Sequence, residues 1–317
     1  MNMENEKLYQ GFNHDFLIDE KVNERVELPI LGIRHNNDEA PVIGNATSIL
    51  NYINFSVKLS ASRKLPIYTA SNIDGALFKK ASRAKSWKKD LRAQAYQWGQ
   101  ELYSAQKSDF DKGHMTKRED VQWGETVGLA QKAADSTFYY SNAVPQHKDL
   151  NQEIWKSLED YILHTETRKK SLKVCVFTGP ILSQNDPLFV TQVKDETILL
   201  PIIFWKVVVF PKEDGKLYRV GFMMSQNKLL TENGIVEELE AATDEAELFM
   251  QFDDAATYQV NVSLIEKLAD IKLPAAIDSY NDDRSIKLIL EEIDIDPDLE
   301  SFSIEETLGF SISNITL

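Results

Sequence analysis

The stretch Asp109-Phe-Asp-Lys-Gly-His-Met-Thr-Lys-Arg-Glu-Asp120 places one histidine, His114, directly after a glycine. Glycine permits a tight backbone, so we expect His114 on a short turn from which its imidazole projects. Histidine is the side chain whose ordinary pKa best suits proton abstraction near neutral pH. Most lone histidines are structural or surface groups. His114 therefore becomes a candidate general base only because neighbouring segments supply other parts of a site.

Two later segments supply those parts. The first, Asp135-Ser-Thr-Phe-Tyr-Tyr-Ser-Asn-Ala-Val-Pro-Gln146, predicts a strand over residues 136–143 that is closed by Asn142. The second, residues 151–161, predicts a helix that carries the carboxamide of Asn151 and the carboxylate of Glu159. Mg²⁺ takes oxygen ligands and keeps several waters, so Asn151 could supply one ligand.

Glu159 lies eight residues after Asn151, which places it roughly 12 Å further along a helix axis. We therefore expect it to orient waters on the metal rather than to bind the ion directly. Taken singly, Asn151 could equally be a helix N-cap and Glu159 a solvated carboxylate. The site hypothesis depends on their occurring together with His114.

These segments resemble a known family. Asp111-Lys-Gly-His114 resembles the Asp-Arg-Gly-His signature of the DNA/RNA non-specific endonucleases, the ββα-metal or His-metal finger nucleases. The resemblance extends over residues 50–275 and includes Asn142-Ala-Val-Pro-Gln-His147 and Leu158-Glu-Asp-Tyr161. It implies an enzyme that cuts DNA, and RNA as a second substrate, with little sequence preference and leaves 5′-phosphate ends.

The resemblance also implies a role for individual residues. His114 would be the general base, Asn151 the direct Mg²⁺ ligand, and Glu159 the carboxylate that orients the waters of the metal. Mn²⁺ is expected to substitute for Mg²⁺. Asn142 would be an active-site amide near those waters. These roles are what the likeness to the family implies for this chain.

The chain departs from the family signature at Lys112, which stands where the family has arginine. Lysine keeps the charge but loses the bidentate fork that suits phosphate, so we expect weaker transition-state stabilisation. A catalytically weakened nucleic-acid-binding or regulatory module of the same fold therefore stays as the alternative. The family also uses an arginine of the early hairpin, for which Arg63 is the candidate. Contacts to nucleic acid are further expected from Lys112, Lys117 and Arg118.

The net charge of −15 argues, taken globally, against binding to nucleic acid. Basic residues nevertheless concentrate between positions 79 and 118, and acidic residues concentrate in 232–247 and 291–306. This distribution permits a local positive groove, although the basic stretch could instead be a solvated helix face. The acidic C-terminal segment is a candidate site for a regulatory partner or for assembly. We expect a homo-oligomer, either a dimer or larger.

The order of apolar runs predicts an α+β fold with a mostly antiparallel central sheet, flanking helices and a ββα-metal finger active site. We divide the chain into a loosely attached polar segment (1–25), the endonuclease domain (26–285) and an acidic tail outside the catalytic core (286–317). Strands are expected at 51–58, 64–72, 173–177, within 198–210, 216–224 and 255–262. Helices are expected at 87–103, 122–134, from 149 or 150 to about 164, and at 263–270, the last capped by Ser263.

Nothing in the sequence indicates a membrane or an oxidising compartment. The first residues lack the apolar core of a secretory signal, and the apolar run 198–210 is interrupted by Pro201 and Lys206. Cys175 is the single cysteine and lies in an apolar run, so we expect a buried thiol and no internal disulfide. We expect a cytoplasmic protein without membrane contacts, and antiviral defence is one consistent setting.

Overall fold

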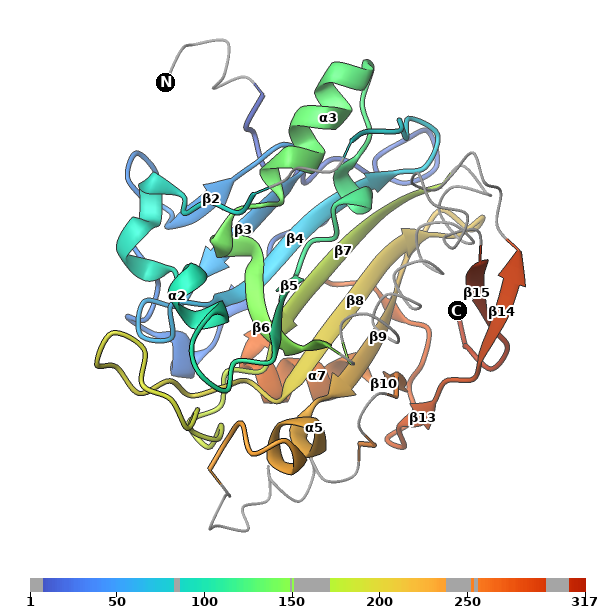
Figure 1. Ribbon diagram of the computed structural model, residues 1–317. Coiled ribbons are helices and arrows are strands. Elements are labelled where there is room, and N and C mark those ends of the chain that lie inside the picture. Colours follow the sequence, from blue (N-terminus) through green and yellow to red (C-terminus); the bar gives the residue numbers. More distant parts are fainter. Residues whose placement is uncertain are drawn as a thin grey trace.

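The computed structural model describes residues 8–82, 86–148, 150, 172–237, 252–253, 256–294 and 308–317. Within these residues the centre of the fold is a nine-stranded sheet. Its strands are β2 (Ile49–Asn51), β3 (Phe55–Leu59), β4 (Pro66–Asp74), β7 (Lys173–Pro180), β8 (Ile203–Pro211), β9 (Leu217–Ser225), β10 (Tyr258–Val260), β12 (Ile277–Asp278) and β13 (Ile286–Lys287). They follow the spatial order β13, β10, β9, β8, β7, β4, β3 and β2, all antiparallel, while β12 pairs parallel to β9 (Figure 1). The predicted α+β fold with a mostly antiparallel sheet is confirmed.

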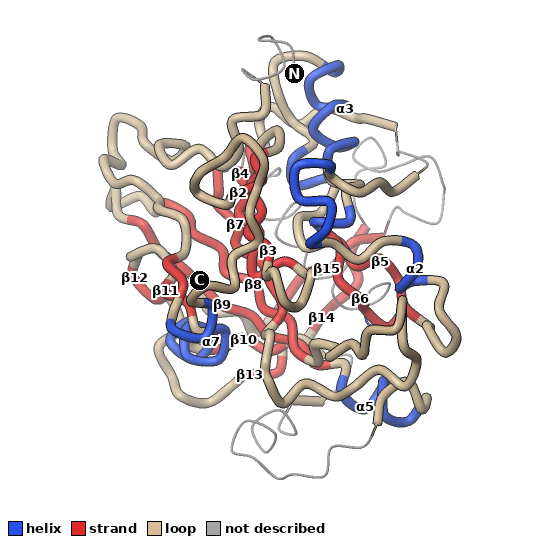
Figure 2. Tube along the Cα trace, turned by 90° about the vertical axis from the view of Figure 1, so that its left-hand side faces the viewer, coloured by secondary structure: helices blue, strands red, loops and turns tan. Residues whose placement is uncertain are grey.

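Other elements cover both faces of this sheet. The hairpin of β5 (Phe110–His114) and β6 (Ala143–His147) lies with helix α3 (Val127–Ser136) on one face, in front of the sheet in Figure 1. Helix α7 (Val262–Ala269) lies on the opposite face, as the view in Figure 2 shows. The remaining elements are η1 (Ile33–His35), η2 (Leu91–Tyr96), η3 (Glu119–Val121), η4 (Tyr140–Asn142), α2 (Gln100–Tyr103), α5 (Asn227–Glu232), the pair β1 (Ile30–Leu31) and β11 (Ile271–Lys272), and the pair β14 (Leu290–Asp294) and β15 (Leu308–Ile312).

Strand β8 shows why the central strands are apolar on both sides. Trp205 and Val207 belong to the buried cluster that contains Ile265 of α7. Phe204 and Val208 belong to a second buried cluster, which contains residues of the β5–β6 side. A strand covered on both faces has no solvated side, and its sequence therefore reads as a continuous apolar run rather than an alternating one.

Two small residues in the sheet have specific packing reasons. Gly221 of β9 lies under α7, where an added Cβ would be 2.9 Å from Cδ1 of Ile265. Cys175 of β7 is fully buried, as predicted, and burial raises the pKa of its thiol well above the usual range. The amide of Asn72 donates a hydrogen bond of 3.4 Å to its sulfur.

Most predicted strands are present with shifted ends. The expected hairpin is β3 and β4, which pair antiparallel, and the later runs become β7, β8, β9 and β10. The helix expected at 263–270 is α7, but its N-cap is Asn261, whose side chain accepts a hydrogen bond from the Ser263 amide. Capping by Ser263 was therefore wrong, because the helix starts one residue earlier.

The helix predicted over residues 87–103 is wrong. This segment forms η2 with a non-helical Ala93 and then the single turn of α2. The buried side chain of Gln97 donates to the carbonyl oxygens of Asp90 and Ala93 and accepts from the Asp90 amide. These bonds hold the backbone in a turn that a regular helix could not form, although the apolar spacing fits a helix.

The strand predicted over 136–143 is also wrong. Ser136 ends α3, the η4 turn follows, and β6 begins only at Ala143. Helix α3 itself was expected over 122–134 and begins at Val127, because the side chain of Thr126 caps it. The helix predicted from residue 149 or 150 to about 164 lies, apart from Leu150, outside the described residues.

Both ends of the described chain are attached to the fold. Phe12, Phe16 and Val22 are buried in the main apolar cluster, so the loose attachment expected for the first segment is wrong for residues 8–25. Near the other end, β13 joins the edge of the central sheet, and Leu288 and Ile312 are buried. The expectation that everything after 285 lies outside the core is thus wrong for these residues, while the proposed boundaries stay predictions. In the described ranges, no helix combines the length and hydrophobicity that crossing a bilayer requires.

Candidate active site

The β5–β6 hairpin brings together the two segments that the sequence analysis selected. Asp111 pairs with Gln146, Lys112 with Pro145, Gly113 with Val144, and His114 with Ala143. His114 is therefore the last residue of a strand, and the expected short turn at this position is wrong. Because alternate residues of a strand point to the same side, Lys112 and His114 share one face of the hairpin.

Aromatic rings fix the position of His114. The ring of Trp87 lies 4.5 Å from the imidazole, centroid to centroid, and that of Phe138 lies 5.0 Å away in an edge-to-face arrangement. Backbone hydrogen bonds between Lys88 and residues 138 and 140 hold both rings beside the strand. Trp87 was not predicted as a site residue, and its place within the basic stretch near the motif was the only signal for it.

Asn142 ties the residues after His114 to the start of β6. Its side-chain oxygen accepts from the Thr116 amide at 2.8 Å, and its NH₂ group donates to the carbonyl oxygens of Thr116 and Thr137. The Met115 amide also donates to the Asn142 carbonyl oxygen. The side chain is fully buried, so these bonds make Asn142 a positioning residue. They give no support to the predicted contact between its amide and waters on a metal, which stays a prediction.

Lys112 lies on the His114 side of the hairpin with its ammonium 5.5 Å from the centre of the Tyr103 ring. Tyr103 ends α2 and is buried, so the ring is a fixed support for the lysine. A cation held over an aromatic face keeps its ammonium available to an anion. This position is consistent with the predicted contact between Lys112 and a phosphate.

Gly113 is required by packing. A Cβ at this position would lie 1.9 Å from Oε1 of Gln146, whose side chain crosses the strand at the glycine. The Gln146 side chain is fully buried, and neither its oxygen nor its nitrogen has a hydrogen-bond partner among the residues that the structure describes. A buried amide without partners is costly, and it is a natural partner for an ordered water or a hydrated cation.

Gln226 anchors the end of β6 to the central sheet. Its side chain accepts from the His147 amide at 2.8 Å and donates to the carbonyl oxygens of Pro145 and Pro201. The residue follows β9 directly and is fully buried. The carboxamide of Gln226 thereby bonds the end of the hairpin that carries His114 to the residue following β9 and to Pro201.

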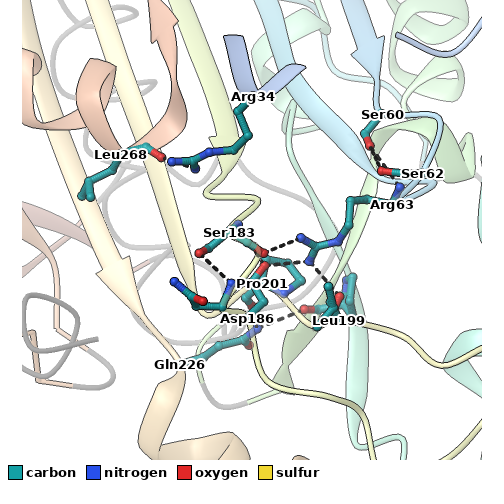
Figure 3. A network of polar contacts seen from close by, with 12 residues as sticks. Arg34, Ser60, Ser62, Arg63, Ser183, Asp186, Leu199, Pro201, Gln226 and Leu268 are labelled. Carbon is teal, nitrogen blue, oxygen red and sulfur yellow. Dashed lines mark hydrogen bonds and ion pairs between the residues drawn. The ribbon is translucent and has the colours of Figure 1, made fainter. Parts of the chain in front are cut away.

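The guanidinium of Arg63 is bonded to other residues of the protein and is not free to bind a phosphate. Its guanidinium donates to the Asp186 carboxylate at 2.6 Å and to the carbonyl oxygens of Ser183 and Leu199 (Figure 3). The Arg63 side chain is 13% exposed and that of Asp186 is 1% exposed. The structure thus gives Arg63 a structural role, and its expected role as the early-hairpin arginine is not supported.

Arg118 and Lys117 follow the hairpin. The Arg118 side chain is 11% exposed, forms an ion pair with Glu119 and donates to the carbonyl oxygen of Ala81. Burial would raise the pKa of Glu119, but the charges of Lys117 and Arg118 lower it to about 2. Arg118 is thus bonded within the fold, and nucleic-acid contact by Arg118 and by the half-buried Lys117 stays a prediction.

The two residues predicted to serve the metal, Asn151 and Glu159, lie outside the described residues. Leu150 is described, and it is buried in the same apolar cluster as Met115 and Val144 of the hairpin region. Among the described ranges, no group of three His, Cys, Asp or Glu side chains could hold a metal. Mg²⁺ needs few protein ligands and accepts amide oxygens. The buried amide of Gln146 has that chemistry, but it pairs with Asp111 and therefore lies on the face of the hairpin opposite to Lys112 and His114.

Comparison with known protein families matches residues 36–279 to the family described as DNA/RNA non-specific endonuclease. The chain belongs to this family. Its members are metal-dependent nucleases. The resemblance inferred from the motif at residues 109–120 is therefore confirmed.

Relatives of this chain are known from bacteria and from mitochondria. It is 36% identical over 230 residues to "Uncharacterized protein y4fB" of Sinorhizobium fredii (strain NBRC 101917 / NGR234), which covers 68% of this chain and 32% of that protein. It is 32% identical over 123 residues to the mitochondrial Endonuclease G of Bos taurus, covering 37% of this chain and 38% of the relative. It is 31% identical over 111 residues to the Nuclease of Serratia marcescens, covering 34% of this chain and 41% of the relative.

The chain thus spans 32% to 41% of the length of these curated relatives. Among solved structures, the EndoG/EndoGI complex superposes on this endonuclease chain with a TM-score of 0.49 at 20% sequence identity. That alignment covers 70% of this chain and 84% of the other.

Proposed function

We propose that the chain is a Mg²⁺-dependent endonuclease that hydrolyses phosphodiester bonds of DNA, and of RNA as a second substrate, leaving 5′-phosphate ends. The observation that carries the proposal is the β5–β6 hairpin, which presents His114 between two aromatic rings with Lys112 on the same face. A histidine held in one orientation beside a cation is the arrangement that general-base attack on a phosphate requires.

In the proposed reaction, a water molecule attacks the phosphorus and passes its proton to the imidazole of His114. The bond between phosphorus and the 3′ oxygen breaks, the phosphate stays on the 5′ end, and the 3′ oxygen takes up a proton to leave as a hydroxyl. The ammonium of Lys112 stabilises the negative charge that builds on the phosphate oxygens. Trp87 and Phe138 keep the imidazole in line with the attacking water.

The divalent ion supplies Lewis acidity and lowers the pKa of bound water when it is present. Asn151 would hold it directly, and Glu159 would orient its waters, as the family resemblance implies. The position of Leu150 in the cluster with Met115 and Val144 supports this assignment, because it returns the chain to the hairpin immediately before Asn151.

The test is cleavage of supercoiled plasmid and of single-stranded RNA with Mg²⁺, with Mn²⁺ and with a chelator. Substituting His114→Ala should lower the rate by roughly 10²- to 10⁴-fold, the usual contribution of a general base. The control is His14→Ala, at a half-buried histidine of the N-terminal segment. Equal rates for wild type and His114→Ala, or cleavage that persists in chelator, would contradict the proposal.

The alternative, a binding module with weakened catalysis, predicts another pattern. Wild type and His114→Ala would then bind nucleic acid with the same affinity, and neither would cut it. A mobility-shift assay on both proteins, run beside the cleavage assay, separates the two functions.

Assembly and regulation by the acidic segment 286–317 stay proposals, as do a cytoplasmic setting and a role in antiviral defence. Because Leu288 and Ile312 are buried, deletion of this segment would expose apolar core and confuse the result. Substituting its acidic side chains by amides and measuring activity and sedimentation is the cleaner test. Unchanged activity and unchanged mass would contradict a regulatory role.

A further inference from the structure

A lysine-lined cavity of about 450 Å³ lies next to the loop between β3 and β4, which contributes Lys64, and no predicted site residue lines it. Three lysines, two glutamates and one tryptophan define what we name the lysine groove: Lys64, Lys89, Lys194, Glu101, Glu196 and Trp98. Three positive charges against two negative charges make it locally basic in a chain whose net charge is −15. Such a local excess of positive charge is what a polyanion needs in an acidic protein.

Aromatic contacts connect the groove to the candidate active site. Trp87, which touches His114, also lies 5.8 Å from the ring of Tyr140. The Tyr140 hydroxyl donates to Gln100, the residue before Glu101, at 3.1 Å. Lys89 follows Trp87 by two residues, so the groove begins where the aromatic wall of the His114 site ends.

The lysines of the groove are held by carboxylates. Oε1 of Glu101 accepts from Lys89 at 2.7 Å and from Lys194 at 2.9 Å. Burial would raise the pKa of Glu101, but these two hydrogen bonds lower it to about 2. Lys64 bonds Glu196 at 2.5 Å and lies 4.5 Å from the centre of the Trp98 ring. A carboxylate shared by two ammonium groups occupies a position that a phosphate oxygen could take.

The two ion pairs of Glu101 differ in exposure. The Lys194 side chain is 60% exposed, whereas those of Lys89 and Glu101 are 25% and 24% exposed. The pair with Lys194 is therefore screened by solvent and is the weaker of the two. A phosphodiester that enters the groove would exchange the charge-assisted hydrogen bonds of Glu101 on these lysines for its own.

We propose that the lysine groove binds the substrate backbone beyond the cleaved bond, with Lys89 and Lys194 on phosphate oxygens. In the free protein, Glu101 holds these lysines and is displaced when nucleic acid binds. The inference rests on the proposed function, since it takes nucleic acid as the substrate of the His114 site. It extends that function by adding a substrate-binding site that the family motif does not contain.

The sharpest test is a gain of affinity. In a His114→Ala background, which prevents cutting, Glu101→Gln should tighten binding of a duplex DNA long enough to reach the groove. Lys89→Gln with Lys194→Gln should weaken that binding by roughly three- to tenfold and reduce the slope of log affinity against log salt by about 0.9 per lost phosphate contact. The matched control is Lys272→Gln, at an exposed lysine of β11 on the opposite side of the sheet.

A second measurement uses substrate length in the cutting enzyme. The Lys89→Gln/Lys194→Gln variant should raise KM for a long strand and leave KM for a dinucleotide unchanged, because a dinucleotide at the His114 site ends before the groove. Lys194→Gln alone, at the most exposed of the three lysines, gives the same direction if the double variant does not fold.

The outcomes separate the two proposals. If wild type cuts and the groove variants behave like Lys272→Gln, the cluster is a surface salt-bridge network and the inference is wrong while the proposed function stands. If the variants change binding but wild type never cuts, the groove is correct and the enzyme proposal is wrong. If Glu101→Gln weakens binding instead of tightening it, the carboxylate does not compete with phosphate and the inference is overturned.

Discussion

The β3–β4 hairpin and the β5–β6 hairpin each carry a cation that the sequence marked for nucleic acid, and they use it differently. Arg63, in the loop after β3, meets one carboxylate and two carbonyl oxygens, and its side chain is 13% exposed. Lys112, in the middle of β5, lies over the ring of Tyr103 on the same face as His114. The comparison teaches that a positive charge becomes structural or available according to the acceptors that surround it, which sequence position alone does not reveal.

Removing Arg63, the cation with a structural role, should have the largest effect on the free energy of unfolding. Arg63→Ala leaves the buried carboxylate of Asp186 without its counterion, which should lower the free energy of unfolding by about 3–5 kcal/mol. Urea denaturation measures this loss. The control, Arg25→Ala, breaks an exposed pair with Asp15 and should cost at most about 1 kcal/mol. If both variants lost a similar amount of unfolding free energy, Arg63 would contribute no more to stability than an exposed ion pair does.

Removing Lys112, the cation that lies on the His114 face, should lower activity rather than stability. Lys112→Ala should lower kcat/KM for DNA by about 10- to 100-fold, the equivalent of the ~1.5–3 kcal/mol of a charged hydrogen bond, with little change in unfolding free energy. Lys112→Arg should keep or raise the rate, because arginine restores the bidentate fork. Steady-state kinetics of the three proteins decide the matter. A Lys112→Ala enzyme that is destabilised but fully active per folded molecule would show that Lys112 stabilises the fold and does not act on the substrate.

Gly113→Ala tests whether the β5–β6 hairpin tolerates any added volume. Its new Cβ would lie 1.9 Å from Oε1 of Gln146, so the side chain or the strand must move, at a cost of about 1–3 kcal/mol. Thermal unfolding and cleavage rate should both fall. The double variant with Gln146→Ala should recover most of the stability, because the clash is removed. Additive losses in the double variant would show that another contact requires the glycine.

We expect the smallest effect on stability from the ion pair of Arg118 with Glu119. Arg118, like Arg63, bonds to a carboxylate and to a backbone carbonyl oxygen. Because the folded-state pKa of Glu119 is lowered to about 2, the unfolded chain binds its proton first as pH falls. The stability contributed by this pair is therefore present above the ordinary carboxyl pKa of about 4 and is lost as pH falls toward 2. Glu119→Gln should flatten the dependence of Tm on pH in this window. Glu125→Gln, at an exposed position before α3, should leave it unchanged.

The sheet could be predicted from the sequence because its strands are long apolar runs. β7, β8 and β9 stand where the β-branched and aromatic stretches indicated them. The family resemblance implied a ββα unit in this region, but the pairing of residues 110–114 with 143–147 was not predicted, since periodicity gives no register between distant segments. The position of Lys112 and His114 on one strand face was not predicted, because the sequence analysis expected a short turn at His114.

What the sequence did not predict depends on side chains that bond to backbone. Gln97 converts an apolar helical pattern into turns, and Asn142 ends the region expected to be a strand. The same limitation applies to the cations, because the acceptors of Arg63 lie more than a hundred residues away in the chain. Trp87 was missed for a related reason, since nothing local indicates that it will touch His114.

Cys175 offers a practical consequence. It is the single thiol of the chain, and it is fully buried in the middle of β7 with its ionisation suppressed. Alkylating reagents attack the thiolate, so this sulfur should stay unmodified while the sheet is intact and react once it separates. The rate of its modification therefore reports how often the centre of the molecule comes apart. Fluorophores attached to cysteines introduced at the surface would then be incorporated without competition from the native sulfur.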